Sequence, residues 1–254
     1  MVEFWTSART LKYLSFLIVF AAWEFAGRVP VSPAFPTFLE TMLALWGMIA
    51  DGAMAKALPE TLVPLVIGMA ISGVLGVAIG VSMGLSRLAE WFGGPIFIVA
   101  QSAPLAALVP LLVLAYGIGL TSKVIVVCIM AMPVIVLNSA NAVRHTPQSL
   151  KEMGQAFQGT RWQIIKQIIL PAASPVIFSG LRLGASAGFI GAILAELYIT
   201  PTGIGDLITY NQSIADYAAM YAAIFTIIVL AVAFLDILEK AEFILFRPDK
   251  RVVK

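Results

Sequence analysis

Long apolar runs separated by short polar segments dominate the chain. Each run is close to the roughly 20 residues that a helix needs to cross the hydrocarbon core of a bilayer. A charge at the centre of such a helix costs about 2.5–3.5 kcal/mol on insertion scales, so windows without charge locate the spans. Six candidate windows emerge, at residues 11–26, 62–85, 91–116, 124–143, 172–199 and 217–238, although the first, fifth and sixth still contain charged residues. The pattern predicts an all-α membrane protein with six transmembrane helices.

Composition agrees with this pattern. Of the 254 residues, 60% are hydrophobic and 12% are charged, which is more apolar surface than one soluble core needs. The formal net charge of +2 gives no indication of a nucleic-acid partner. Arg9 and Lys12 precede the first window as they would in a secretory signal, but Trp23-Glu24 stands where a cleavage site is expected, so we predict an uncleaved anchor. We expect residues 1–254 to form a single transmembrane domain.

The basic residues predict the orientation, because cytosolic segments carry an excess of Lys and Arg. With a cytosolic N-terminus, the outside segments hold only Arg28, Lys56 and Lys123, while Arg182 falls inside the fifth window. The inside segments then hold all the others, namely Arg9, Lys12, Arg87, Arg144, Lys151, Arg161, Lys166, Lys240, Arg247, Lys250, Arg251 and Lys254. Both termini are therefore predicted to be cytosolic. The external connection 27–61 contains an apolar piece at 38–49 that we expect to lie along the interface.

One polar segment, residues 152–171 (EMGQAFQGTRWQIIKQIILP), lies between the fourth and fifth windows on the predicted cytosolic side. Met153, Ala156 and Phe157 share one helical face, and a second face follows the turn residue Gly159. Two short amphipathic helices are predicted. Thr160 can cap the second, and proline suits the first turn of the next span. The same pattern also fits an interfacial loop whose apolar side chains rest on lipid or on neighbouring spans.

This segment resembles the cytosolic coupling motif of permease subunits of ABC importers. Glu152 stands at the motif's glutamate, and Ile168, Leu170 and Pro171 match its Ile-x-Leu-Pro ending with the spacing kept. Met153 and Gly154 replace two usual alanines. Gln158 replaces the usual glycine, with Gly159 one residue later, where the tolerance of glycine for positive φ is still available.

Further stretches are similar to the nitrate, sulfonate, taurine and bicarbonate group of these permeases. They are Trp23-Glu24, GVSMGLSR at 80–87, PLAALVPLLVLAYGIG at 104–119, Arg161-Trp162, GLRL at 180–183, Ala195-Glu196 and Gly203-Ile204-Gly205. The resemblance implies the type I ABC importer permease fold in the bacterial cytoplasmic (inner) membrane. Pro64 and Gln101 depart from the group, because arginines are common at those two positions.

The resemblance also implies the partners. Two ATPase subunits would bind ATP and Mg, so this chain would be no enzyme and would bind no cofactor or metal of its own. An external binding protein would deliver the solute, a second permease copy would complete a homodimer, and lipid would surround both. Residues 144–171 would be the coupling segment, which docks a helix in a cleft of the ATPase. The residues expected there are Glu152, Ala156, Phe157, Gln158, Gly159, Arg161 and Pro171.

Polar residues inside spans are expensive in lipid and are therefore candidates for the solute pathway or its gates. The candidates are Gln101, Ser102, Asn138, Ser186, Arg182 and Glu196. For the small polar side chains, a hydrogen bond back to their own helix is the competing interpretation. Arg182 and Glu196 lie about 21 Å apart along one helix and cannot pair, so we expect an inner role for Arg182 and an outer role for Glu196. Glycines of the second and fifth windows are expected to let helices pack closely.

Two other classes of protein stay open from the residues. An ion-coupled secondary transporter would explain the spans and their polar residues, but we see no inverted repeat. A membrane enzyme would need a cluster of catalytic groups, whereas the chain has one histidine and one cysteine. We expect the solute to be a small anion such as a sulfonate, a nitrate or an aromatic carboxylate. A pyrimidine precursor of thiamin is the alternative.

Overall fold

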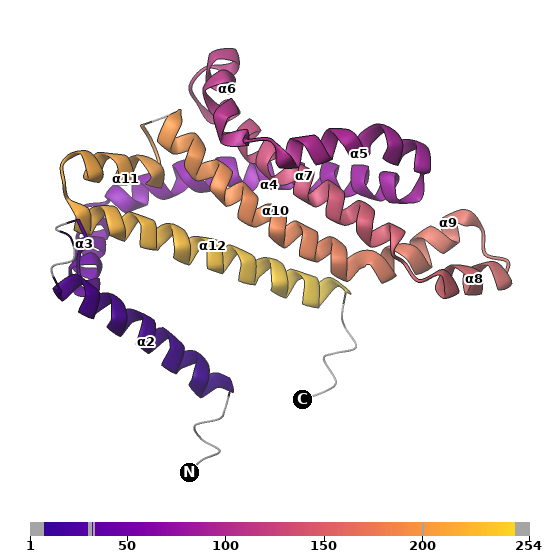
Figure 1. The fold of residues 1–254 in the computed structure, drawn as a ribbon, viewed down its shortest axis with the longest axis horizontal. Coiled ribbons are helices and arrows are strands. Elements are labelled where there is room, and N and C mark those ends of the chain that lie inside the picture. Colours follow the sequence, from indigo (N-terminus) through magenta and orange to yellow (C-terminus); the bar gives the residue numbers. More distant parts are fainter. Residues whose placement is uncertain (1–7, 30–31, 33, 200, 247–254) are drawn as a thin grey trace, which may run out of the picture. The chain divides into compact units, whose positions relative to one another are not determined.

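The structure, a computed structural model, describes residues 8–29, 32, 34–199 and 201–246, and every regular element among them is a helix (Figure 1). The longer helices are α2 (Ala8–Arg28), α4 (Ala53–Leu85), α5 (Arg87–Ser102), α7 (Leu120–Arg144), α10 (Leu170–Tyr198) and α12 (Tyr217–Phe246). The shorter ones are α3 (Phe38–Ala50), η1 (Leu105–Leu108), α6 (Val109–Tyr116), α8 (Gln148–Ala156), α9 (Arg161–Ile164), η2 (Ile165–Ile169) and α11 (Ile204–Ser213). The all-α prediction is confirmed.

Two compact units divide the chain. Unit 1 consists of Met1–Pro59 and Thr202–Ile228, and unit 2 consists of Glu60–Pro201 and Val229–Lys254. Four helical segments are long and apolar enough to cross a membrane: Ala53–Leu85, Leu120–Arg144, Arg161–Tyr198 and Tyr217–Phe243. They match the second, fourth, fifth and sixth predicted windows. The 21-residue helix α2 occupies the first window. Arg247, Lys250, Arg251 and Lys254, used above for the orientation, lie outside the described residues.

The third window is not one helix, so the prediction of a continuous span over 91–116 is wrong. Helix α5 ends at Ser102, and η1 and α6 follow as separate short elements. The break lies at Ala103-Pro104. Proline has no N–H to donate and its ring disfavours the helical conformation of the residue before it. Ala103 is accordingly extended, with φ −68° and ψ 146°.

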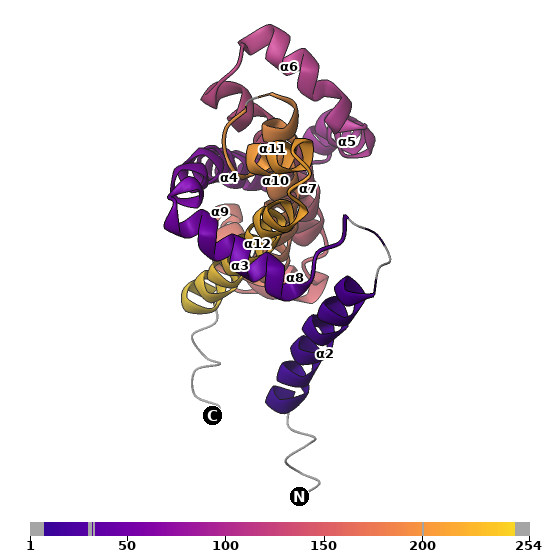
Figure 2. The same cartoon turned by 90° about the vertical axis from the view of Figure 1, so that its left-hand side faces the viewer.

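Glycines bring α4 and α10 close to α7 in unit 2, where Figures 1 and 2 both show α7 alongside α10. A Cβ built at Gly76 would lie 3.0 Å from a side-chain carbon of Ile135, and one at Gly184 would lie 2.4 Å from another. Ile135 is fully buried between them. The predicted packing role of these glycines is confirmed, because a side chain at either position would collide with the neighbouring helix.

Gly80 is the glycine of α4 for which we expect the clearest loss. A Cβ there would lie 2.5 Å from the carbonyl oxygen of Val136, and a backbone atom cannot move aside as a flexible side chain can. We expect Gly80→Ala to destabilise the protein by about 1–3 kcal/mol, the usual cost of overpacking. Thermal unfolding in detergent measures it. The matched control is Gly73→Ala, whose nearest neighbour is 3.5 Å away and which should be neutral or stabilising. Equal midpoints for the two variants would contradict the close-packing interpretation.

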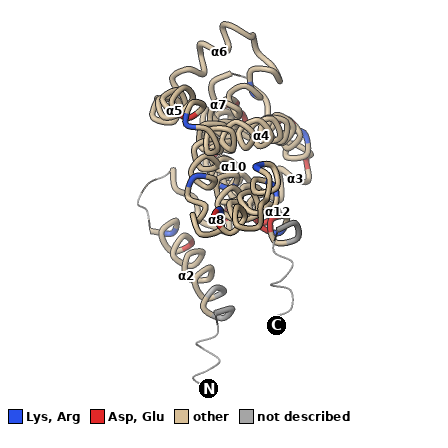
Figure 3. Tube along the Cα trace, turned by 90° about the vertical axis from the view of Figure 1, so that its right-hand side faces the viewer, with Lys and Arg blue, Asp and Glu red and all other residues tan. Residues whose placement is uncertain are grey.

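The core of unit 2 forms where α4, α7 and α10 meet. Its buried residues are Leu65, Met69, Val127, Ala131, Ile135, Ala185, Phe189 and Ala192. Phe234 from the unit 2 part of α12 packs on this cluster and meets Phe189 edge to face, with ring centroids 5.5 Å apart. Many large apolar side chains point outward instead, such as Val74, Leu88 and Trp91, and bilayer lipid can cover these. Figure 3 shows few charged positions along the helices.

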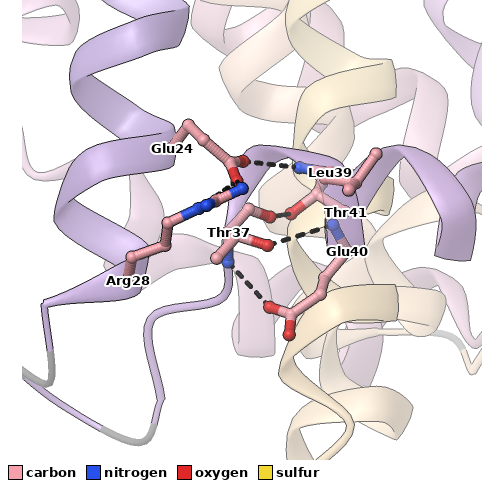
Figure 4. Close-up of polar contacts among 6 residues, drawn as sticks. All are labelled: Glu24, Arg28, Thr37, Leu39, Glu40 and Thr41. Atoms are coloured by element: carbon pink, nitrogen blue, oxygen red, sulfur yellow. Dashed lines mark hydrogen bonds and ion pairs between the residues drawn. The ribbon is translucent and has the colours of Figure 1, made fainter.

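In unit 1, Trp23 and Glu24 fix the corner between α2 and α3. The Trp23 indole N–H donates to the carbonyl oxygen of Pro36 (3.1 Å), and a Glu24 carboxylate oxygen accepts from the backbone N–H of Leu39 (3.0 Å) (Figure 4). Arg28 holds the other Glu24 oxygen at 2.7 Å. The carboxylate thus occupies the N-terminus of α3, where free N–H groups and the helix dipole favour an anion.

The same corner has a capping box. Thr37 Oγ1 accepts from the N–H of Glu40, and the Glu40 carboxylate accepts from the N–H of Thr37. Helix α3 therefore begins at Phe38, where the apolar piece of the external connection was predicted. Pro30 and Pro33 of the predicted connection lie outside the described residues.

Candidate functional site

Helix α8 presents an apolar face that the described residues leave uncovered. Met153, Ala156 and Phe157 are all exposed, and 82% of Phe157 is accessible to solvent. Glu152 lies exposed on the same helix, and its carboxylate accepts a hydrogen bond from the Gln148 side chain (3.2 Å). The prediction of a first short amphipathic helix is confirmed.

The turn after α8 depends on Gln158. Its N–H donates to the carbonyl oxygen of Gln155 (2.8 Å), and the N–H of Gly159 donates to that of Gly154 (3.0 Å). These two bonds define a Schellman motif, in which the residue just past the helix takes the left-handed conformation. That residue is Gln158, with φ 55°. Gly159 therefore does not supply the positive φ. Glycine is needed at position 159 because the backbone passes close to Gly154: a Cβ at Gly159 would lie 2.9 Å from the Gly154 carbonyl oxygen.

Gln158→Gly should stabilise this turn. A residue with a Cβ pays about 1–2 kcal/mol in the left-handed conformation, and glycine does not. We expect a gain of about 1 kcal/mol, seen as roughly fivefold slower hydrogen exchange in a peptide covering 153–160. Gln155→Gly is the matched control, since it puts glycine inside α8 and should cost about 1 kcal/mol. Faster exchange in Gln158→Gly would contradict the assignment of the turn.

The second predicted short helix is not separate, which corrects that part of the prediction. Thr160 does cap α9, through a capping box with Gln163. From there the chain continues as helix through η2, a π-helical turn, into α10, so that residues 161–198 form one helical segment. Pro171 lies in the first turn of α10 as predicted. Arg161 and Trp162 are exposed at the start of this segment.

Glu196, the predicted outer residue of α10, is part of a buried ion pair with Lys123 of α7. Lys123 Nζ lies 3.3 Å from Glu196 Oε1 and donates to the carbonyl oxygen of Glu60 (3.2 Å). The Thr61 hydroxyl of α4 donates to Glu196 Oε2 (3.0 Å). Lys123 is only 2% exposed and Glu196 only 3%. Three helices are thereby joined by groups that cannot be left unpaired in an apolar interior.

Arg182 makes the corresponding connection nearer the other end of α10. Its guanidinium lies 3.2 Å from the carboxylate of Glu242, which is buried, and 3.9 Å from that of exposed Glu239, both on α12. It also donates to the Ser179 hydroxyl. As predicted, Arg182 and Glu196 do not pair with each other. Each instead ties α10 to another helix of unit 2.

The smaller polar candidates bond to their own helices. Asn138 Nδ2 donates to the carbonyl oxygen of Val134 (2.8 Å), Ser102 to that of Ile98 (2.9 Å) and Ser186 to that of Arg182 (3.3 Å). Gln101 is exposed on α5. The structure therefore does not gather the six candidates into one site. It distributes them over α5, α7 and α10.

Sequence reasoning missed Lys123 and Glu242. Lys123 was counted in an external segment. The structure places it within helix α7, which begins at Leu120, four residues before the charge-free window. Glu242 was not considered, because it follows the sixth window. A search for acids and bases just outside the windows would have found both. Arg144, assigned to the inside, pairs with Glu90 at the start of α5.

Comparison with known families gives one match. The family described as "Binding-protein-dependent transport system inner membrane component" matches residues 72–241, about two thirds of the chain. The match includes the whole segment 144–171 and the two intramembrane charges of α10.

Several bacterial proteins are similar to the chain. The formylaminopyrimidine transport permease protein ThiX of Halalkalibacterium halodurans is 26% identical over 94% of this chain and 95% of its own length. The taurine transport system permease protein TauC of Escherichia coli is 28% identical over 83% of this chain and 78% of its length. The riboflavin transport system permease protein RibX of Chloroflexus aurantiacus is 33% identical, but the match spans about half of each chain.

Solved structures resemble the fold. A chain of the inward-facing MetNI methionine ABC transporter superposes with a TM-score of 0.63 at 20% identity, over 76% of this chain and 94% of that one. A chain of an amino acid ABC transporter gives 0.56 at 16% identity, over 79% of this chain and 98% of that one. The expected ABC importer permease fold is confirmed at this level. This chain belongs to the family of inner-membrane permease components of binding-protein-dependent ABC transport systems.

Proposed function

We propose that this chain is the membrane-spanning subunit of an ATP-driven importer, assembled from two permease copies, two ATPase subunits and an external binding protein. The exposed apolar face of α8 is the observation that carries this proposal. A Phe at the end of a short cytosolic helix, with most of its surface in water, is typical of an anchor that a partner covers. ATP and Mg would bind to the partner, and this chain would contribute no catalytic group.

The proposed topology has six spans with both termini in the cytosol. The distribution of Lys and Arg supports it, and four candidate spans and α2 agree with it in position. The third crossing would be made by α5, η1 and α6 together. Broken helices are tolerated at membrane depth where protein or a water-filled cavity surrounds them.

In this function α10 carries one contact of a proposed outer gate and one of a proposed inner gate. Its outer end would be held by the pair Glu196–Lys123 and its inner part by Arg182–Glu242. Movement of the ATPase cleft would displace α8, and α10 would follow because helix continues from residue 161 into it. Gln101, Ser102, Asn138 and Ser186 are the proposed polar positions of the pathway.

For the solute we propose a small anion such as a sulfonate, because the relative TauC is named for taurine, which carries a sulfonate group. A pyrimidine is the second candidate, because the formylaminopyrimidine permease matches over almost the full length of both chains. Selectivity would lie largely in the external binding protein.

Reconstitution tests the function. The permease is purified with its ATPase subunit and binding protein and placed in proteoliposomes. Uptake of labelled taurine and formylaminopyrimidine is then measured with and without internal and external ATP. Uptake that requires ATP on the α8 side supports the proposal, and the accumulated compound names the solute class. Uptake that persists without ATP but collapses with the ion gradient would instead support a secondary transporter.

A further inference from the structure

A contact without an intervening side chain joins α8 to the helical segment that leads into α10. Gly154 is buried on the side of α8 that faces this segment. A Cβ at Gly154 would lie 2.6 Å from Ile168 Cδ1 and 3.1 Å from Ile164 Cγ1. The backbone of α8 therefore rests directly on these two isoleucines, and Figure 1 shows α8 folded back beside α9.

The contact reaches the π-helical turn η2. Ile168 lies within Ile165–Ile169, where the N–H of Leu170 bonds to the carbonyl oxygen of Ile165, five residues back. Pro171 follows and has no N–H for the carbonyl oxygen of Gln167, which favours the wider turn. Such turns are rare single-turn features within α-helices and are places where helices bend.

The residues of the turn also pack against the helices on the other side. Ile169 is buried in a cluster with Ala142 and Val143 of α7 and Ala173 and Ile177 of α10, and Ile164 and Ile165 pack against it. The turn thus contacts α8 on one side, through Ile168, and the cluster between α7 and α10 on the other, through Ile165 and Ile169.

We propose that η2 is a pivot between the coupling segment and α10, and that Ile164 and Ile168 are the positioning residues through which α8 acts on it. This inference rests on the proposed function. Helices α8 and α9 move as one body because Gly154 lies against Ile164, and α10 tilts relative to them at the π turn. The exposed face of α8 then binds the partner, while the buried face passes on the movement.

Deletion of Lys166 tests the pivot. A π turn holds one residue more than the α turn it replaces, so deleting this exposed residue gives a continuous α-helix with the flanking faces still in register. In proteoliposomes holding the complete complex, the deletion should leave ATPase association and ATP hydrolysis unchanged. Uptake per ATP hydrolysed, with labelled taurine or formylaminopyrimidine as the probe, should fall about tenfold, within the usual range of coupling between sites. Lys166→Ala, which keeps the length, should behave as wild type.

Gly154 variants test the contact without changing the chain length. Gly154→Leu keeps or improves helix propensity but wedges α8 away from η2, so uptake per ATP should again fall about tenfold. Gly154→Ala should be tolerated, because the Ile168 Cδ1 atom is the movable end of a side chain. Adding Ile168→Ala to Gly154→Leu makes room for the leucine and should restore most of the uptake.

The outcomes separate the two proposals. Wild-type uptake per ATP in the Lys166 deletion and in Gly154→Leu overturns the pivot alone. If the deletion fails to assemble, the Gly154 series decides: no restoration by Ile168→Ala overturns the contact. A wild-type permease that neither copurifies with the ATPase nor takes up either probe with ATP overturns the proposed function and the pivot with it.

Discussion

Glu196→Ala should be among the most destabilising single substitutions in unit 2. It removes the carboxylate that Lys123 meets at 3.3 Å and leaves a buried ammonium group without its closest charged partner. Breaking a buried ion pair in this way costs about 3–5 kcal/mol, more than most single mutations. The expected result is a large drop in the thermal midpoint and a low yield of monodisperse permease, measured by fluorescence-detected size exclusion after heating.

Two control variants separate burial from charge. Glu239→Ala removes an exposed carboxylate that lies 3.9 Å from Arg182, and it should cost no more than about 1 kcal/mol. The double substitution Lys123→Met with Glu196→Met replaces both charges by apolar groups of similar size and should recover much of the stability lost in Glu196→Ala. If Glu196→Ala unfolds at the same temperature as Glu239→Ala, the pair does not hold the helices together.

Phe157→Asp should abolish stable association with the ATPase while leaving the permease folded. The side chain makes few contacts within the chain, so the thermal midpoint should not change. Loss of an aromatic anchor at an interface costs about 2–4 kcal/mol, which weakens association by roughly 30- to 1000-fold. Copurification of the two subunits and their dissociation constant in nanodiscs measure the effect.

Phe157→Leu is the matched variant, since it keeps an apolar side chain on the same face of α8 and should retain most of the association. An aspartate variant that copurifies with the ATPase as well as the wild type would exclude this face of α8 as the docking surface, even if the rest of the proposed function holds.

The sequence predicts the spans wherever lipid is the deciding environment. Windows with few or no charges marked the four candidate membrane helices, since a charge in the core of a lipid-facing helix is costly. Hydropathy did not predict the break at Ala103-Pro104, because it measures how apolar a segment is and not whether each residue has an N–H to donate. It also misplaced Lys123, because a charge that is paired inside the protein looks from sequence alone like a charge in water.

The coupling segment was predictable in its faces but not in its turn. Periodicity gave the exposed face of α8, and the cap at Thr160 followed from residue type. No local rule puts glutamine in a left-handed conformation when a glycine is next to it. The close approach of Gly159 to the Gly154 carbonyl oxygen decides the matter, and only the fold contains that information.

The glycines of α4 also bear on how this helix can exist. Gly68, Gly73, Gly76, Gly80 and Gly84 would each weaken a helix in water by about 1 kcal/mol relative to alanine, roughly 5 kcal/mol together. In hydrocarbon an unfolded backbone is far more costly, because every free N–H and C=O group loses several kcal/mol. The lipid therefore maintains a helical backbone that these residues do not favour by themselves. Their lack of a side chain can then serve close packing between helices. A sequence so rich in glycine can serve as a close-packing surface only as long as it stays in the bilayer.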